Sequence, residues 1–489
     1  MTDELLTSLM ASVNAMLPVI VLALWGCVLL LVDLFLPQER KGVNAGLAAL
    51  GLLAALALAL LRRSSSLSGF GGMLAVDQFS SFLNVLLLVS GLAGVALAYD
   101  YLKRTGIERG EYYALLLFAI SGMMLMGMSA DLIMIFLSLE LLSIPLYVLA
   151  GIAVPRMNSE EASLKYFLLG SFSSGFFVFG TALIYGATGA TNLAKVLAAA
   201  GAGARDPQLL LGGAALVLIG LGFKVAVVPF HMWTPDVYQG SPSAVTAFMA
   251  VGAKAAGFAA LLRIFVLALP SIAADMTPVL WVLAALTMIL GNTVAVAQTN
   301  IKRLLAYSSI AHAGYILMAL VPYGQGSRIA ADSVASALFY LAGYALTNFA
   351  AWSVVIALEK AEEKGLELSD YAGLGRKYPA LAAVMVVAML SFTGVPPTLG
   401  FMGKFYLFRT VVEGGFYWLA VIGVLTSLVS AYYYLRVVVV MYMQNGEPEV
   451  RQERWLVAMA YASALAVVLL SIFASPLLQW ASQAVIQLF

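Results

Sequence analysis

Four ionisable side chains lie inside long apolar stretches of this sequence. Glu140 lies in DLIMIFLSLELLSIPLYVLAG, Lys224 in LLGGAALVLIGLGFKVAVVPFHMW, Lys254 in AVTAFMAVGAKAAGFAALL and Lys404 in SFTGVPPTLGFMGKFYLF. A charge at the centre of a membrane segment costs about 2.5–3.5 kcal/mol on insertion scales. Burial disfavours the charged form of such a group. A buried lysine can therefore take up and release a proton, and a nearby acid modulates that exchange.

The structural alternative is a static buried ion pair that fixes helix packing. The apolar stretches hold three central lysines, with Lys165 near the start of a further stretch, against one clear acid, Glu140. One acid cannot neutralise all of these lysines as static ion pairs, so the excess of lysines favours a hydrated proton path. Lys165 follows Glu160 and Glu161, and it either pairs with these acids or supports proton transfer. His312 is either a packing residue or a member of a relay.

Two of these stretches are interrupted by helix-breaking residues. One interruption is Val228–Pro242, which contains Pro229 and His231, and the other is Thr393–Gly400, which contains Pro396 and Pro397. Proline removes a helical hydrogen bond, and in lipid the freed backbone groups must face protein or a water-filled cavity. His231 either relays a proton, since histidine titrates near neutrality, or caps the broken helix. Paired interruptions of this kind indicate a transport site.

The composition requires a membrane to position these residues. Of 489 residues, 62% are hydrophobic and 10% charged, against about 25% charged in soluble domains. The net charge of +1 excludes a strongly basic nucleic-acid binder, so no nucleic-acid partner is expected. Cys27 is the single cysteine, which excludes a disulfide scaffold and an iron–sulfur cluster held by this chain alone. With two histidines, redox centres on this chain are not expected.

The expected fold is an all-α integral membrane protein with about fourteen transmembrane helices, because a crossing helix needs about 20 apolar residues. The N-terminus carries Asp3 and Glu4 where a signal peptide needs positive charge, so the first span is expected to be retained. The expected spans are 15–36, 44–61, 78–99, 111–128, 131–153, 162–186, 209–230, 243–269, 277–297, 303–321, 331–358, 380–408, 416–440 and 456–486.

The distribution of basic residues predicts the orientation of the chain. Alternate loops starting with the first hold fourteen Lys and Arg residues, and the opposite loops hold five. Since basic loops stay in the cytoplasm, both termini are expected on the outer, periplasmic side. The polar stretch Glu359–Lys377 is then a cytoplasmic loop.

The interrupted spans are the seventh and the twelfth, five spans apart, which predicts two five-helix repeats. An odd number of spans per repeat makes the second repeat inverted. The expected domains are residues 1–110 with three transmembrane helices, 111–270 and 271–445 with one five-helix repeat each, and 446–489 with a C-terminal helix.

Several motifs resemble a known family, the subunit N family of bacterial NADH:quinone oxidoreductase (respiratory complex I), within the Mrp-antiporter-like membrane subunits. The resemblance covers about residues 75–440. The motifs are LELLSIPLY at 139–147, KYFLLG at 165–170, FK at 223–224, PFHMWTPDVYQGSP at 229–242, AK at 253–254, KRLLAYSSIAHAGY at 302–315 and GVPPTLGFMGK at 394–404.

The resemblance implies a half-channel on each side of the membrane, built on inverted repeats. Glu140 and Lys224 would form a coupled pair, and Lys254 would carry the proton along the central axis. Lys165 and His231 would support this transfer, and Lys404 would deliver the proton outward. FMN, iron–sulfur clusters and quinone are expected on partner subunits of the membrane complex, and none of them on this chain.

The leading expectation is therefore a proton-translocating subunit of a quinone-reducing complex in the bacterial plasma membrane. Its partners would be other membrane-arm subunits, the lipid bilayer and protons. One alternative is a subunit of a multi-subunit Na+/H+ antiporter, which could share the broken helices and the lysines. Another is a scaffold subunit that does not pump.

Overall fold

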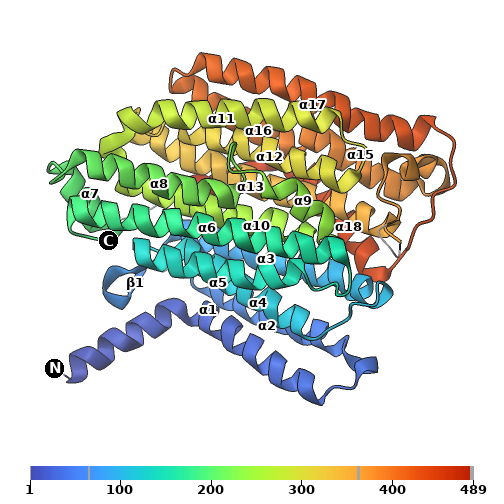
Figure 1. Ribbon diagram of the computed structural model, residues 1–489, viewed down its shortest axis with the longest axis horizontal. Coiled ribbons are helices and arrows are strands. Elements are labelled where there is room, and N and C mark those ends of the chain that lie inside the picture. The colour runs from blue at the N-terminus through green and yellow to red at the C-terminus, as the bar shows by residue number, and fades with distance from the viewer. Residues whose placement is uncertain (1, 64–65, 361–363, 485–489) are drawn as a thin grey trace.

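Long helices make up most of this chain, and many of them run side by side across the molecule (Figure 1). The computed structural model describes residues 2–63, 66–360 and 364–484. Helices suit a membrane interior because each one satisfies its own backbone hydrogen bonds. Helix α10 lies at the centre, buried along its whole length, and it contacts α3, α4, α8 and α13. Residue Lys254 on α10 therefore has no direct exposure to lipid.

The N-terminal part contains the helices that form one side of the molecule. They are α1 (Thr2–Phe35), α2 (Val43–Leu61), α3 (Gln78–Arg104), α4 (Glu111–Met128), α5 (Leu132–Ala150), α6 (Met157–Thr188), α7 (Leu193–Gly201), α8 (Pro207–Val225), α9 (Trp233–Gly240) and α10 (Ser243–Leu261). Helix α1 contains Pro18 and bends in its middle (Figure 1). Asp77 begins α3 with a capping box, in which it exchanges hydrogen bonds with Ser80.

The C-terminal part packs beside α8–α10. Its helices are α11 (Ala273–Val296), α12 (Ile301–Leu320), α13 (Ser327–Leu358), α14 (Leu374–Lys377), α15 (Pro379–Thr393), α16 (Leu399–Glu413), α17 (Tyr417–Met443), α18 (Arg454–Ile472) and α19 (Ala474–Gln483). A π-helical segment, Leu262–Ala268, continues α10 toward α11.

Both predicted helix breaks are present. The seventh expected span ends as α8 at Val225, and α9 begins at Trp233 after a non-helical segment. The twelfth expected span is divided into α15 and α16, which are separated by residues 394–398. The prolines Pro229, Pro396 and Pro397 lie in these two breaks. The breaks follow from proline chemistry, since each proline lacks the N–H that would continue the helix.

Within the described part of the chain, twelve helical segments are long and apolar enough to cross a membrane. Two of the expected fourteen are not among them. Helix α12 carries Lys302, Arg303 and His312, and the divided α15–α16 span has no single helix of sufficient length. The last expected span, 456–486, is also shorter than predicted, because α18 ends at Ile472 and a separate helix follows. Its residues 485–486 lie outside the described part.

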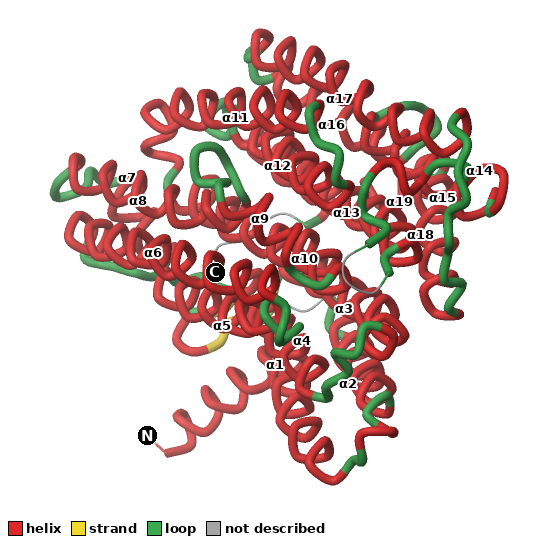
Figure 2. Tube along the Cα trace, turned by 45° about the vertical axis from the view of Figure 1, so that its right-hand side comes forward, coloured by secondary structure: helices red, strands yellow, loops and turns green. Residues whose placement is uncertain are grey.

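A short β-hairpin connects α2 to α3, and the all-helical prediction missed it. Strands β1 (Leu67–Gly69) and β2 (Leu74–Val76) pair antiparallel, with Leu67 opposite Val76. Figure 2 shows strand as a short yellow segment near α5. The hairpin is joined to the segment before α5, where the Ala130 amide donates to the Met73 carbonyl at 2.8 Å. The strands are too short to show an alternating apolar pattern in the sequence.

Candidate proton-transfer site

Lys224 lies in the last turn of α8, where it is 3% exposed. Its ammonium donates to the Ser143 hydroxyl on α5 at 2.7 Å and to the Tyr166 hydroxyl on α6 at 3.2 Å. The nitrogen also lies 5.8 Å from the centre of the Tyr147 ring. A cation is favourable at the C-terminal end of a helix, and hydroxyl oxygens replace part of its lost hydration. The lysine is therefore held without a directly paired carboxylate.

Glu140 lies one helical turn before Ser143 on α5. One of its carboxylate oxygens accepts from the Ser174 hydroxyl at 2.5 Å. Among the described residues, no ion pair within 4.0 Å joins Glu140 to Lys224. Because residues three apart share a helix face, Ser143 lies on the side of α5 that carries Glu140. Glu140 and Lys224 therefore lie near the same face of α5, but each has its own hydroxyl partners.

The segment that follows α8 is held by side chains from other helices. The Val228 amide donates to the Thr287 hydroxyl at 3.0 Å, and the Trp233 indole N–H donates to the Phe223 carbonyl at 2.9 Å. His231 is 6% exposed in this segment, and its Nδ1 has no hydrogen-bond partner among the described residues. The structure does not bring His231 into a hydrogen bond with Lys224, so its predicted relay role stays a prediction.

Lys254 is 3% exposed near the middle of α10. Its ammonium donates to both the carbonyl and the hydroxyl oxygen of Ser309 on α12, the latter at 2.6 Å. The Tyr344 hydroxyl on α13 donates to the same Ser309 hydroxyl at 3.0 Å, and the Lys254 nitrogen lies 5.5 Å from the Tyr344 ring centre. Ser309 therefore joins the central lysine to two further helices.

His312 connects the surroundings of Lys254 to those of Lys404. Its ring lies 5.3 Å from the Tyr344 ring and 5.8 Å from the Tyr315 ring, centre to centre. Its two nitrogens contact the Tyr340 hydroxyl at 2.5 Å and the Tyr434 hydroxyl at 3.1 Å. A histidine with both nitrogens in hydrogen bonds can accept a proton on one side and donate one on the other.

Lys404 lies on α16 and reaches back to the end of α15. Its ammonium donates to the carbonyl oxygens of Phe392 and Thr393, both at 2.9 Å, and to the Ser427 hydroxyl at 2.7 Å. It lies 4.7 Å from the Tyr315 ring centre. The helix break at Gly394, which has φ +89°, exposes these last carbonyls, and the partial negative charge of a helix end favours the cation.

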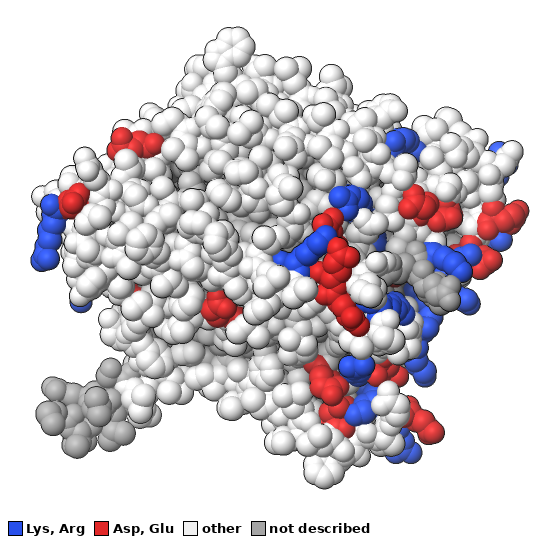
Figure 3. Space-filling view, viewed as in Figure 1, with Lys and Arg blue, Asp and Glu red and all other residues white. Residues whose placement is uncertain are grey.

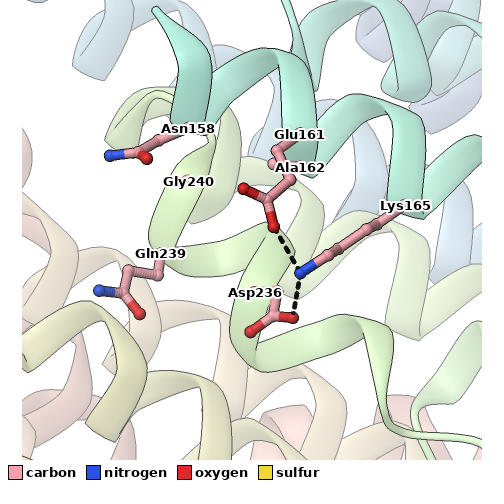
Figure 4. Close-up of a pocket in the computed structure, with 7 residues that line it drawn as sticks. All are labelled: Asn158, Glu161, Ala162, Lys165, Asp236, Gln239 and Gly240. Carbon is pink, nitrogen blue, oxygen red and sulfur yellow. Dashed lines mark hydrogen bonds and ion pairs between the residues drawn. The ribbon is translucent and has the colours of Figure 1, made fainter.

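Lys165 is located at a polar cavity of about 190 Å³ on the molecular surface, between α6 and α9 (Figure 4). It donates to Glu161 and Asp236, each at 2.7 Å, while Arg303 contacts the other oxygen of Asp236 at 2.9 Å. Burial would raise the pKa of Asp236, but the hydrogen bonds from Lys165 and Arg303 outweigh it and lower that pKa. Of the two roles that the sequence allows for Lys165, pairing with nearby acids is the one that its contacts show.

Arg263, in the π-helical segment that continues α10, is paired with a buried acid. Its Nη2 contacts both oxygens of Asp77, at 2.9 and 3.0 Å, and both side chains are fully buried. Its Nε donates to the Gly127 carbonyl at 2.8 Å. A buried pair of this kind fixes the packing of α10 on α3 and α4, and it does not extend the line of lysines.

Sequence reasoning missed the neutral groups that hold the lysines. They are Ser143, Tyr166, Ser309, Tyr344 and Ser427. A partial signal existed for Ser143, because it follows Glu140 by three residues on a helix face. The described residues contain no cluster of three or more His, Cys, Asp or Glu side chains that could bind a metal ion.

The fold and the site together define a polytopic helical membrane protein with lysines buried at and between two broken helices. Residues 129–430 match the model of a protein family described as "NADH:quinone oxidoreductase/Mrp antiporter, TM". NADH-quinone oxidoreductase subunit N of Chloroflexus aggregans is 47% identical to this chain, over 94% of each sequence. The chain therefore belongs to the NADH:quinone oxidoreductase/Mrp antiporter family, and its curated relatives include subunit N sequences.

Two solved structures extend this comparison. A chain of respiratory complex I from Thermus thermophilus is 38% identical, with a TM-score of 0.82, and the match covers 95% of this chain and 99% of that one. A chain of the Mrp complex from Dietzia sp. has a TM-score of 0.85 at 21% identity, over 97% of each chain. The second likeness concerns the fold alone.

Proposed function

We propose that this chain is the subunit N type of proton-translocating membrane subunit in a bacterial NADH:quinone oxidoreductase. Two relatives that bear that name are 47% and 46% identical to this chain over almost its whole length. The carrying observation is the line of buried lysines, each held by hydroxyl or carbonyl oxygens and not by a carboxylate. Such lysines can exist in either protonation state, and a proton path needs that property.

The proposed route uses Glu140 and Lys224 as a coupled pair, then Lys254, then Lys404. Ring contacts of Tyr344, His312 and Tyr315 lie between the last two lysines, and His312 also contacts the hydroxyls of Tyr340 and Tyr434. Lys165 and His231 support proton access at the first broken helix. Electron transfer from NADH to quinone, with FMN and iron–sulfur clusters, takes place on partner subunits and drives this route through contacts between the chains.

The proposed architecture has fourteen membrane crossings in two inverted five-helix repeats. The two additional crossings are α12 and the divided α15–α16 span. Support comes from the two breaks, which lie at corresponding places beside Lys224 and Lys404. The proposed units are residues 1–110, 111–270, 271–445 and 446–489.

The proposed location is the bacterial plasma membrane, with both termini outside and further membrane-arm subunits as neighbours. Charged side chains gather from near the centre of Figure 3 to its right-hand edge, and the zone between them and the few charges at the left-hand edge is almost uncharged. Such a middle zone suits contact with lipid or with apolar partner helices.

Replacement of Lys224 tests the proposal directly. We would prepare membrane vesicles that contain the whole complex with Lys224→Met, Lys224→Arg, or the control Lys195→Met, since Lys195 is exposed on α7. We expect proton flux through this chain to fall about 100-fold in both Lys224 variants, as when a positioned proton donor is removed. Arginine keeps the charge but does not release its proton. NADH oxidation, proton translocation and subunit content would be measured in the same vesicles.

The same measurement separates the alternatives. Normal pumping in Lys224→Met vesicles that contain the assembled complex would support a scaffold and contradict the proposal. Normal pumping with Lys224→Arg alone would mean that the charge is needed and its release is not. Purification without flavin and iron, together with sodium-dependent proton movement, would favour the Na+/H+ antiporter reading, whose fold is shared by the Dietzia chain.

A further inference from the structure

Glu359 is a buried acid that belongs to none of the groups described above. It follows α13 directly, at the start of the polar stretch expected as a cytoplasmic loop, yet it is 2% exposed. Its Oε1 accepts from the Tyr101 hydroxyl of α3 at 3.0 Å. Its Oε2 is buried and has no hydrogen-bond partner within the described part of the chain. One oxygen is therefore fixed by tyrosine, and the other is available for exchange.

The surroundings of Glu359 contain further buried hydroxyls with unused hydrogen-bonding capacity. The Ser241 and Ser243 hydroxyls and the Tyr371 hydroxyl have no partner among the described residues. The Ser243 amide donates to the Tyr101 oxygen at 3.1 Å, so the start of α10 lies directly beside the pair. Burial and the Glu359 carboxylate both raise the pKa of Tyr371, which keeps that hydroxyl protonated. Buried polar atoms of this kind are usually satisfied by water.

Polar contacts continue from this cluster to the central lysine. The Thr246 hydroxyl, one turn into α10, donates to the Tyr238 carbonyl at 3.3 Å. The Tyr238 hydroxyl lies 3.5 Å from the Ser309 hydroxyl, which accepts from Lys254 at 2.6 Å. The hydroxyls of Thr246 on α10, Tyr238 on α9 and Ser309 on α12 therefore lie between the Glu359 cluster and Lys254.

A buried cation lies beside the same segment. Lys302 is 1% exposed, and its ammonium donates to the Ser241 carbonyl at 2.6 Å. Arg104 and Arg156 are also on this side of the molecule, where they donate to the Ile356 and Thr105 carbonyls, each at 2.8 Å. These three cations lie at the same end of the molecule as Glu359, each bound to a backbone carbonyl.

We propose that Glu359 takes protons from the cytoplasmic side and passes them along α10 to Lys254. The carboxylate Oε2 forms an O–H bond with a proton from cytoplasmic water. That bond then breaks as the proton passes to water beside Ser241 and Ser243, and an N–H bond finally forms on the neutral Lys254 amine. The charge balances because the carboxylate is restored at each cycle. This inference rests on the proposed function and on its orientation.

The test uses the whole complex in inverted membrane vesicles, with the proton-translocation rate and subunit content measured together. Three variants are compared. Glu359→Gln cannot accept a proton, and Glu359→Asp can. Tyr101→Phe removes the hydrogen bond to Oε1 of Glu359. Glu453→Gln is the matched control, because Glu453 is a partly buried acid that pairs with Arg104 at 2.7 Å. Lys224→Met is measured beside them as the reference for the proposed function.

We expect Glu359→Gln to lose as much translocation as Lys224→Met and Glu359→Asp to recover most of that loss. Tyr101→Phe should be about tenfold slower, the rate equivalent of one hydrogen bond to a charged group. Normal translocation in Glu359→Gln beside a defective Lys224→Met would overturn this inference alone. Normal translocation in both would overturn the proposed function. The complex with Glu359→Gln could fail to assemble, and the other two variants then decide. The inference is overturned if assembled complex with Glu359→Asp does not pump. It is also overturned if Tyr101→Phe pumps at the parent rate.

Discussion

Asp236 is held by two cations that belong to different helices. Lys165 on α6 and Arg303 on α12 each contact one of its carboxylate oxygens, and Figure 4 shows Lys165 directed at the carboxylate. The Asp236 side chain is 36% exposed, so solvent screens both contacts. Its lowered pKa means that the folded state favours the ionised carboxylate. The three residues thus attach the short helix α9 to the helices on either side.

Asp236→Asn should therefore lower thermal stability at neutral pH. We expect a loss of about 0.5–1 kcal/mol, the range for partly exposed ion pairs. A carboxyl whose pKa is lowered by folding contributes stability above its unfolded pKa and loses it as the pH falls through the folded pKa. The difference between parent and variant should thus stay constant from pH 8 to about pH 5, because the ordinary aspartate value is near 4.

The measurement is the unfolding midpoint of the purified complex at several pH values and two salt concentrations. Glu160→Gln is the control on α6, the helix that carries Lys165, since Glu160 is exposed. Added salt should reduce the Asp236→Asn difference by screening the pair. A difference that already shrinks between pH 7 and about pH 5 would show a raised pKa and contradict this account.

At the residue scale, the sequence predicts charged groups better than their partners. Lys224, Lys254 and Lys404 stand out because a charge in an apolar stretch has a large transfer cost. Their hydroxyl partners do not stand out, since serine and tyrosine are common in membrane helices and cost little there. The distance in sequence is also large: Ser309 lies 55 residues from Lys254. Only tertiary packing brings such pairs together.

At the scale of the helices, the close contact between α6 and α8 depends on glycine residues. A Cβ atom on Gly180 would lie 2.7 Å from the Gly213 carbonyl oxygen and 2.8 Å from the Val217 amide nitrogen. Both are backbone atoms, so neither can move without the helix. Small residues allow membrane helices to approach this closely, and the approach places Tyr166 beside Lys224.

Gly180→Ala should separate the two helices and destabilise the chain by about 1–3 kcal/mol, the usual cost of overpacking. Gly175→Ala is a close control, because it lies on the same helix and a Cβ there meets no atom within 4 Å. The measurement is the thermal stability and abundance of the complex in membranes, with the translocation rate as a second readout. Equal stability of the two variants would mean that α6 and α8 are not in tight contact.

Helix breaks could be predicted from the sequence because proline acts locally. The breaks after α8 and α15 contain Pro229, Pro396 and Pro397, and each lies where the sequence placed it. The hairpin at 67–76 and the division between α18 and α19 were missed for the opposite reason. Their short segments are set by packing against distant residues, as with the Met73–Ala130 hydrogen bond, and carry no periodic signal.

At the scale of the whole molecule, the basic loops predict which end faces the cytoplasm. The loop between α17 and α18 carries Arg451 and belongs to the loops rich in Lys and Arg, which are expected in the cytoplasm. The loop between α7 and α8 belongs to the other set, which is expected outside. Because the sequence has a single cysteine, the orientation can be tested chemically. Cys27→Ser gives a cysteine-free background in one step.

In that background we expect Ala202→Cys to react with a membrane-impermeant maleimide in intact cells and Gln452→Cys to react only in inverted vesicles. Both positions are exposed. Each variant serves as the control for the other, and detergent-solubilised protein gives the full labelling signal. The reversed pattern would place both termini in the cytoplasm and would also remove the cytoplasmic origin proposed for protons at Glu359.

The oxygen atoms around Lys224 and Lys404 differ in what they can do when the charge leaves. A hydroxyl can rotate and donate to a neutral amine, whereas a peptide carbonyl only accepts. The two hydroxyl partners of Lys224 therefore suit both forms of the amine. Two of the three partners of Lys404 are carbonyls at a helix end, so they stabilise the ammonium and resist its discharge. We therefore expect release of the proton from Lys404 to require movement of the end of α15, so the peptide backbone at this break would act as the release gate.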